Sequence, residues 1–192
     1  MIFDSNEYCD EEFKTLDLSN ENISTVDFDN CNFKNCIFTE LTLDYCKFVD
    51  CTFEDCDLSL MKIKYSVFND VLIKNSKAIG IDWSLSESPF SINIYNSTIS
   101  MSSFYKLDLK LSNIIGCIAH EVDFVQTNLE KAVFKETDLL NSTFDDTNLK
   151  YTDLSQAINY TINPNLNTLK STKVSLSEAT SFLQFLDIKI VE

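Results

Sequence analysis

Residues 31–58 read CNFKNCIFTELTLDYCKFVDCTFEDCDL, and a large apolar residue recurs in this stretch at every fifth position. The five-residue period extends backward to Phe3 and forward to Trp83. A second run, shifted by one residue, covers Ile94 to Leu154. Every position of both runs is apolar, and most of the 15 Phe lie on them. The period therefore governs most of the 192-residue chain.

A five-residue period excludes the common regular structures. An α-helix turns about 100° per residue, so this period gives it no apolar stripe. A continuous flat strand needs a period of two. The pattern instead fits a short strand, in which residues i−2 and i point inward, followed by a two-residue corner. Such a unit cannot bury its own apolar face, so successive coils must stack as a solenoid.

The repeated units resemble the pentapeptide-repeat family, whose loose pattern is A-(D/N)-(L/F)-x-x. Matching triplets are VDF at 26–28 and 122–124, CDL at 56–58, TNL at 127–129 and 147–149, and TDL at 137–139. The resemblance implies an all-β fold, a right-handed quadrilateral β-helix with four pentapeptides per coil. We expect this β-helix over residues 1–160. A register break through SLSESPFSIN, near residues 84–93, fits a local bulge.

The chain has seven cysteines, and their spacing argues against disulfides and metal binding. Six occupy the inward i−2 position, where a small residue is needed: Cys31, Cys36, Cys46, Cys51, Cys56 and Cys117. No C-x-x-C motif occurs, and in the implied fold stacked cysteines about 4.8 Å apart are poorly placed for an unstrained disulfide. We interpret these cysteines as small buried apolar residues, and we expect no metal and no cofactor.

The regular repeat ends after Leu154, and we expect a separate C-terminal module over residues 161–192. Ser175 followed by Glu178 forms a capping box that predicts a helix over about 176–186. This helix should cap the open last coil, and relatives of the Qnr branch dimerise through this module. A homodimer is therefore expected, followed by the apolar tail 188–191. The residues of the predicted cap and dimer helix are Leu176, Ala179, Phe182, Leu183 and Leu186, with an exposed Phe185 beside them.

No pattern in the sequence indicates an enzyme. The single histidine, His120, lies at an outward position without a nucleophile motif, phosphate loop or metal-ligand spacing around it. The acidic start of the chain does not resemble a secretory signal, and no apolar run approaches the roughly 20 residues that span a membrane. We expect a non-catalytic, cytoplasmic protein.

The charge distribution suggests a partner. The chain carries 30 acidic residues against 15 Lys and has no Arg, and residues 1–60 hold 15 of the acidic residues but only 3 Lys. With four units per coil, positions 20 apart stack, which gathers carboxylates around a single Lys47 on one face: Glu7, Asp10, Asp27, Asp29, Asp50 and Asp70. Such a face should repel nucleic acid and anionic membranes and attract a basic, DNA-binding protein.

Two functions remain in competition. Qnr-type members of the family are dimeric acidic rods that imitate duplex DNA and bind DNA gyrase or topoisomerase IV. The resemblance therefore implies a non-catalytic DNA mimic that binds a type II topoisomerase and could protect it from quinolones. This chain departs from that branch in having no long loop between coils, and Qnr-type proteins use such loops for protection. The alternative is a scaffold repeat protein without a topoisomerase link. A continuous negative stripe would favour mimicry, and scattered charge would favour the scaffold.

Overall fold

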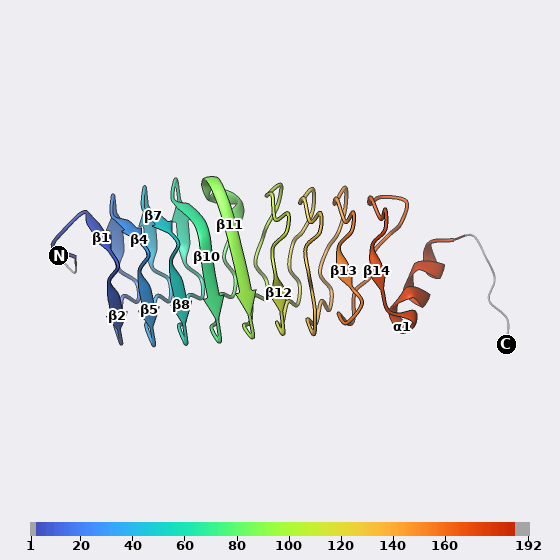
Figure 1. The fold of residues 1–192 in the computed structure, drawn as a ribbon, viewed down its shortest axis with the longest axis horizontal. Helices are drawn as coiled ribbons and strands as arrows, with labels where there is room; N and C mark the ends of the chain where they lie inside the picture. The colour runs from blue at the N-terminus through green and yellow to red at the C-terminus, as the bar shows by residue number, and fades with distance from the viewer. Residues whose placement is uncertain (1–2, 187–192) are drawn as a thin grey trace.

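The computed structural model of the protein describes residues 3–186, which form a β-solenoid of about eight turns with a short helix at its C-terminal end (Figure 1). Consecutive coils pair through parallel strands, and the pairing register is 20 residues in the first half of the chain. The predicted quadrilateral β-helix with four five-residue units per coil is thus confirmed.

The strands are short because each one is a single side of a coil. They are β1 (Glu7–Cys9), β2 (Glu12–Lys14), β3 (Asn22–Ser24), β4 (Asp27–Asp29), β5 (Asn32–Lys34), β6 (Thr42–Asp44), β7 (Lys47–Val49), β8 (Thr52–Glu54), β9 (Lys62–Lys64), β10 (Val67–Lys74), β11 (Glu87–Tyr95), β12 (Ile114–Ile115), β13 (Asp153–Leu154) and β14 (Lys173–Val174). The helical elements are η1 (Trp83–Leu85), α1 (Leu176–Ala179) and η2 (Thr180–Phe185). Between the strands, isolated parallel bridges continue the same stacking up to the last coil.

The core is a column of side chains along the solenoid axis. Every position of the two apolar runs is buried except Tyr8 and Phe13, which are partly buried against the same core in the first coil. Aromatic rings stack from coil to coil, as Phe28 does on Phe48 with ring centroids 5.0 Å apart. This distance matches the spacing of about 4.8 Å between paired strands, so identical residues 20 apart stack face to face.

Each corner contains a residue with a left-handed backbone. Positive φ recurs at every fifth residue from Asp10 to Gly80 and again from Asn96 to Tyr151. Most residue types adopt this conformation at a cost, and Asn, Asp and Gly do so most readily. The corner amide is satisfied across coils, as when the Asp10 N–H donates to the Asp29 carbonyl at 3.0 Å. The two glycines of the chain, Gly80 and Gly116, both occupy such corners.

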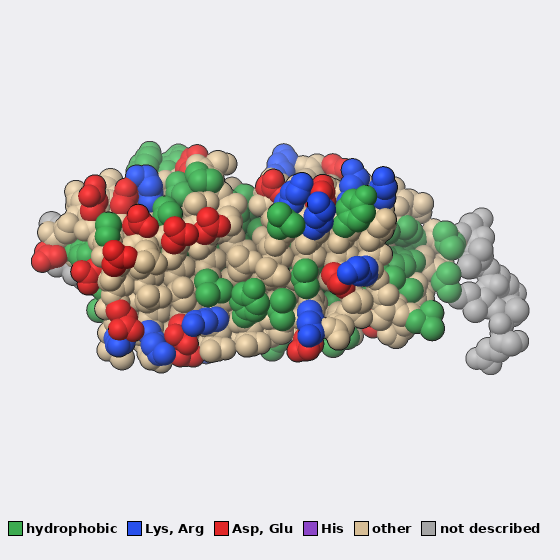
Figure 2. Space-filling model, in the orientation of Figure 1, with side chains coloured by type: hydrophobic (Ala, Val, Ile, Leu, Met, Phe, Trp, Pro, Cys, Tyr) green, Lys and Arg blue, Asp and Glu red, His purple; other side chains and the backbone are tan. Residues whose placement is uncertain are grey.

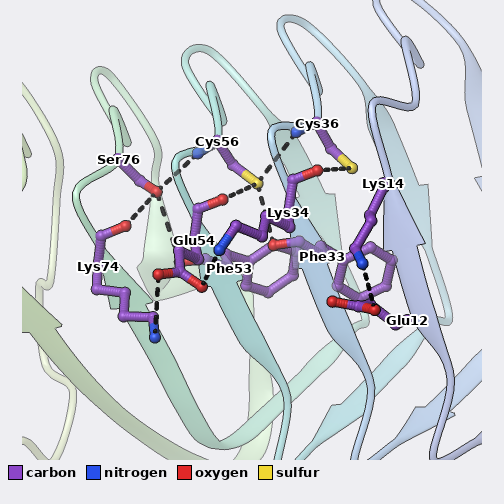
Figure 3. Close-up of polar contacts among 10 residues, drawn as sticks. All are labelled: Glu12, Lys14, Phe33, Lys34, Cys36, Phe53, Glu54, Cys56, Lys74 and Ser76. Carbon is purple, nitrogen blue, oxygen red and sulfur yellow. Dashed lines mark hydrogen bonds and ion pairs between the residues drawn. The ribbon is translucent and has the colours of Figure 1, made fainter.

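The inward i−2 side chains form polar columns that the sequence analysis treated only as small apolar residues. The Cys56 thiol donates to the Phe33 carbonyl at 3.3 Å, and the Cys56 backbone N–H donates to the Ser76 hydroxyl at 2.9 Å (Figure 3). In later coils a threonine has the same role, since Thr127 Oγ1 donates to the Phe104 carbonyl at 2.8 Å. Cys, Ser and Thr are therefore selected for a donor as well as for size.

The predicted register break coincides with a structural irregularity in the pairing of β11 with β10. Lys74 pairs with Glu54, 20 residues before it, but with Tyr95, 21 residues after it, so this coil contains one extra residue. The shift occurs along β10, around Phe68. The core continues through it, because Trp83 still stacks parallel to the Phe104 ring at 6.3 Å.

The C-terminal end differs from the prediction in two respects. The coil stacking continues past residue 160, because Leu154 pairs with Val174 in the last turn. The helix is α-helical only over Leu176–Ala179 and continues as a 3₁₀-helix to Phe185. Its start is as predicted, with the Ser175 hydroxyl accepting from the Glu178 N–H at 3.3 Å. The Glu178 carboxylate, however, accepts from the Asn159 N–H instead of closing the capping box.

The cysteines provide a test of the inward assignment. Cys31, Cys36, Cys46, Cys51, Cys56 and Cys117 are buried free thiols, whereas Cys9 is exposed. Burial raises the pKa of Cys51 to about 12 and that of Cys117 to about 11, which suppresses the reactive thiolate there, whereas a hydrogen bond with Cys56 lowers the pKa of Cys36, so that thiol is protected by its burial alone. We expect an aromatic disulfide reagent to modify Cys9 alone in the native protein and all seven thiols after unfolding. Fast native labelling of any of the six, located by peptide mass mapping, would contradict the inward assignment.

Candidate partner-binding face

The candidate site is the face of the solenoid formed by β1, β4, β7 and the first part of β10. The carboxylates that the sequence placed together do lie on this face and on the corner that follows it: Glu7, Asp10, Asp27, Asp29, Asp50 and Asp70. We call these six residues the acidic face. The 20-residue register brings them together, because β1 pairs with β4, β4 with β7, and β7 with β10.

The strand residues of the acidic face differ in exposure and partners. Glu7 and Asp29 are exposed, while Asp27 is half-buried. Lys47 lies above Asp27 in the next coil, and its Nζ is 2.6 Å from the Asp27 carboxylate. Neither Glu7 nor Asp29 has an ion pair within residues 3–186. A single lysine therefore neutralises part of a larger negative charge.

The corner residues of the acidic face have a structural role that the sequence analysis did not predict. Asp10 and Asp70 both have positive φ, which Asp tolerates better than most residues. The Asp10 carboxylate accepts a hydrogen bond from the Asn30 amide at 2.6 Å, and Asp70 accepts one from the Ser91 hydroxyl at 3.0 Å. Asp50 has no side-chain partner in the described part of the chain. Some of these carboxylates thus also stabilise the stacking of coils.

The negative charge of the acidic face is dense but covers only half of the rod. Four coils span three strand spacings, about 14 Å, so six carboxylates and Lys47 leave one net charge per about 3 Å. Duplex DNA has one charge per about 1.7 Å of axis and a single strand one per about 3.4 Å. Beyond Asp70 the same side carries lysines, and Lys110 pairs with Glu130 at 3.2 Å (Figure 2). The negative stripe is therefore not continuous along the molecule.

On the neighbouring face, formed by β2, β5 and β8, acidic side chains are paired with lysines. Glu54 lies between Lys34 and Lys74, at 3.2 and 3.3 Å, in a ladder of stacked coils (Figure 3). The Lys34 ammonium, and next to it Lys74, hold the pKa of Glu54 below its usual range. The strand carboxylates of this face, Glu12 and Glu54, have lysine partners, whereas among the strand carboxylates of the acidic face only Asp27 has one within residues 3–186. The absence of partners is a local property and not a consequence of composition alone.

The structure places the predicted cap and dimer residues on two different sides of the C-terminal helix. Phe182 packs against the core, with its ring 6.5 Å from that of Tyr160. Phe185 was expected to be exposed, but it is half-buried. In a 3₁₀-helix residues three apart lie on the same side, which places Phe185 next to Phe182. Ala179 and Leu183 are also half-buried, and Leu176, 88% exposed, and Leu186 are the exposed members.

The single histidine of the chain lies beside a carboxylate. His120 Nε2 lies 2.9 Å from the Asp138 carboxylate on the face that precedes the Glu121 corner. Burial alone would raise the pKa of Asp138, but hydrogen bonds from Asn159 and His120 lower it. Within residues 3–186, no three His, Cys, Asp or Glu side chains are grouped as a metal site requires. In the same range no helix is long and apolar enough to cross a membrane.

The comparisons with known proteins agree with this architecture. A model of the pentapeptide repeat region matches residues 26–91, and a model of eight copies of pentapeptide repeats matches residues 123–158. A search of curated proteins finds no match. The chain is a β-solenoid repeat protein, and it belongs to the pentapeptide-repeat family.

Several solved structures share the fold. A trypsin-treated variant of QnrB1, a plasmid-mediated fluoroquinolone resistance protein, is 18% identical with a TM-score of 0.65, covering 97% of this chain and 92% of that one. A second QnrB1 variant is 21% identical with a TM-score of 0.55, covering 97% of both chains. HetL, from the cyanobacterium Nostoc sp. strain PCC 7120 and involved in the regulation of heterocyst differentiation, is 12% identical with a TM-score of 0.52, covering 88% and 85%. At these identities the likeness shows the fold alone.

The sequence analysis overlooked one feature at the other edge of the acidic face. Tyr45 and Tyr65 precede β7 and β10 by two residues, and their rings stack with centroids 4.9 Å apart. Both side chains are exposed. Their 20-residue separation was visible in the sequence and could have identified the stack, because the same spacing located the carboxylates.

The acidic face should reduce the stability of the fold. Asp50 lies one coil before Asp70 and has no side-chain partner among residues 3–186, so Asp50→Asn should raise the free energy of unfolding by about 0.5 kcal/mol, most clearly at low salt. Asp153→Asn is the matched control, because the Ser155 hydroxyl, and then Lys173, hold the pKa of Asp153 below its usual range. Because the pKa of Asp153 is lower in the folded than in the unfolded protein, its carboxylate contributes to the free energy of unfolding above the unfolded pKa of about 4. This contribution is lost as the pH falls through the folded-state pKa.

At neutral pH the control substitution should therefore lower stability while Asp50→Asn raises it. Both are measured by urea unfolding at low and high salt. Equal destabilisation by the two substitutions would show that the carboxylates of the acidic face do not measurably repel one another.

Proposed function

We propose that this protein is a non-catalytic binder of a basic, DNA-binding protein, and that its partner is a type II topoisomerase, DNA gyrase or topoisomerase IV. The observation that carries the proposal is the acidic face, where all carboxylates except Asp27 lack a lysine partner among residues 3–186, while Glu54 on the adjacent face has two. A DNA-binding groove is lined by Lys and Arg that neutralise phosphates, and a stiff row of carboxylates at comparable density meets the same requirement.

The extent of the acidic face limits the kind of mimicry proposed. A negative stripe of about 14 Å covers one basic cluster, not the length of a DNA segment wrapped by a topoisomerase. Each protomer would therefore occupy one end of a DNA-binding surface. The lysines beyond Asp70 would lie outside the contact, because they would repel a basic partner.

Family members support the proposal only at the level of the fold. QnrB1 shares the architecture and is a fluoroquinolone resistance protein, which motivates a topoisomerase as the first partner to test. HetL shares the architecture as well and is involved in the regulation of differentiation. The scaffold function is therefore the competing proposal, and it requires no charge on any particular face.

Reversing the acidic corner tests the proposal. Asp10→Lys, Asp50→Lys and Asp70→Lys together should abolish binding to purified gyrase, whereas Thr15→Lys, Asn35→Lys and Asn75→Lys, at the next corner, should not. All six positions have positive φ, so both triple variants place lysine in the same backbone conformation. Wild-type binding should also weaken steeply with salt, because the partner's Lys and Arg are being neutralised.

Binding is measured by surface plasmon resonance, and function by gyrase supercoiling with and without a fluoroquinolone. Circular dichroism and urea unfolding confirm that both variants are folded. If the wild-type protein neither binds, inhibits nor protects gyrase or topoisomerase IV at micromolar concentration, the topoisomerase proposal is wrong and the scaffold proposal takes its place.

We also propose that the protein is a homodimer formed through its C-terminal end. Figure 2 shows apolar side chains on the visible surface at the C-terminal end of the rod. The exposed large apolar residues of the last coils and the helix are Ile158, Leu166, Leu176 and Leu186. An exposed last coil would otherwise invite edge pairing. The tail at 188–191, which the sequence analysis included in this module, lies outside the described residues.

The dimer can be tested without disturbing the core. Leu176→Glu with Leu186→Glu should convert a dimer into a monomer in sedimentation velocity, since buried charge at an interface is costly and both residues are exposed in the protomer. Leu111→Glu, at an exposed corner several coils before the helix, is the control for added negative charge and should remain dimeric. A monomeric wild-type protein at micromolar concentration would refute the dimer.

A further inference from the structure

The tyrosine stack borders the acidic face on the side opposite its aspartate corner. Tyr45 and Tyr65 are 56% and 43% exposed, and their rings stack at 4.9 Å with planes 22° apart. Both residues have positive φ, a conformation that bulky side chains seldom adopt. Every corner of the solenoid has this conformation, so what distinguishes the two tyrosines is their stacked and exposed aromatic surface, which is available to a partner.

One face of the stack is open. Tyr65 covers one side of the Tyr45 ring, and the 20-residue register places Thr25 on the other side, in the preceding coil. Thr25 is short, and its hydroxyl is turned back to the Ser24 carbonyl at 2.7 Å. A groove of about 420 Å³ lies here, and its lining includes Glu7, Thr25, Asp27, Tyr45, Tyr65 and Glu87. The groove thus combines an uncovered aromatic ring with carboxylates.

The stack already accepts a cation within the molecule. Lys64 Nζ lies 5.0 Å from the centroid of the Tyr65 ring. The Asp27 carboxylate forms an ion pair with Lys47, which shows that it is accessible to a cation. Glu7 has no ion-pair partner among residues 3–186. A ligand that stacks flat on Tyr45 while donating to a carboxylate beside it must be planar, cationic and forked. Among protein side chains only the guanidinium of arginine has these properties.

We propose that Tyr45, together with Asp27 and Glu7, forms a receptor for an arginine side chain of the partner protein. This inference rests on the proposed function, because it assumes that the acidic face contacts a basic protein surface. It adds a chemical preference: the face distinguishes arginine from lysine. The guanidinium stacks on the Tyr45 ring above Thr25 and competes with Lys47 for the Asp27 carboxylate, with Glu7 as the second acceptor.

The test uses two short fluorescent Gly-Ser peptides of equal length and charge, one carrying several arginines and the other several lysines. Fluorescence anisotropy at fixed salt should show that the full-length protein binds the arginine peptide about two- to fivefold more tightly. Tyr45→Ala should remove this preference, whereas Tyr45→Phe, which keeps the ring, should retain it. Tyr105→Ala is the matched control, because Tyr105 is also exposed under a lysine, 4.7 Å from Lys106 Nζ, but lies in the other half of the rod.

The outcomes separate this inference from the proposed function. Equal affinity for the two peptides, or an arginine preference that survives Tyr45→Ala, overturns the arginine receptor while leaving the acidic face as a general cation surface. Loss of preference in Tyr105→Ala as well would also overturn it, since the effect would not be local to the groove. Failure of the gyrase assays, by contrast, does not affect the peptide result, because no topoisomerase is present in it.

Discussion

Every feature of this protein depends on the stacking of one coil on the next at a spacing of about 4.8 Å with a fixed register of 20 residues. Each coil has no core of its own, so its apolar residues are buried only against those above and below. The same spacing produces the stacks of Phe28 on Phe48 and of Phe33 on Phe53, at 5.0 and 4.9 Å. The spacing and register of the coils therefore determine both the packing of the core and the positions of the surface charges.

The corners maintain this register. A left-handed residue every fifth position turns the chain, and its N–H donates to a carbonyl of the next coil, as at Asp10 and Asp29. The inward thiols and hydroxyls add a second set of bonds between coils, from Cys56 to Phe33 and from Thr127 to Phe104. The Cys56 thiol gives the Phe33 carbonyl a donor, and the Thr127 hydroxyl gives the Phe104 carbonyl a second donor beside the Leu107 N–H. The register is thus fixed by hydrogen bonds, and the apolar residues supply the driving force.

Fixed stacking has an electrostatic consequence on the outside. Charges 20 residues apart are held one strand spacing from each other, so a pair of opposite sign becomes a ladder, as at Lys34 and Glu54, and like charges become a repulsive column. The first half of one face has the repulsive arrangement, relieved only by Lys47 and by the hydrogen bonds to Asp10 and Asp70. A rigid rod cannot spread such charges apart, and a basic partner would relieve them.

The sequence by itself determined the coil, the inward residues and the grouping of the acidic face, because each five-residue unit has the same surroundings and its pattern can be interpreted without knowledge of distant contacts. The i−2 cysteines and the break near residues 84–93 could be located for the same reason. Only the tertiary structure decided where the solenoid ends, since the run of apolar fifth residues stops at Leu154, whereas Leu154 still pairs with Val174, 20 residues later, in one more coil. It also decided that the helix tightens to 3₁₀ and half-buries Phe185 beside Phe182. Finally, it decided which carboxylates have partners, because that depends on where a flexible lysine or amide in the neighbouring coil extends, as Lys47 does toward Asp27 and Asn30 toward Asp10.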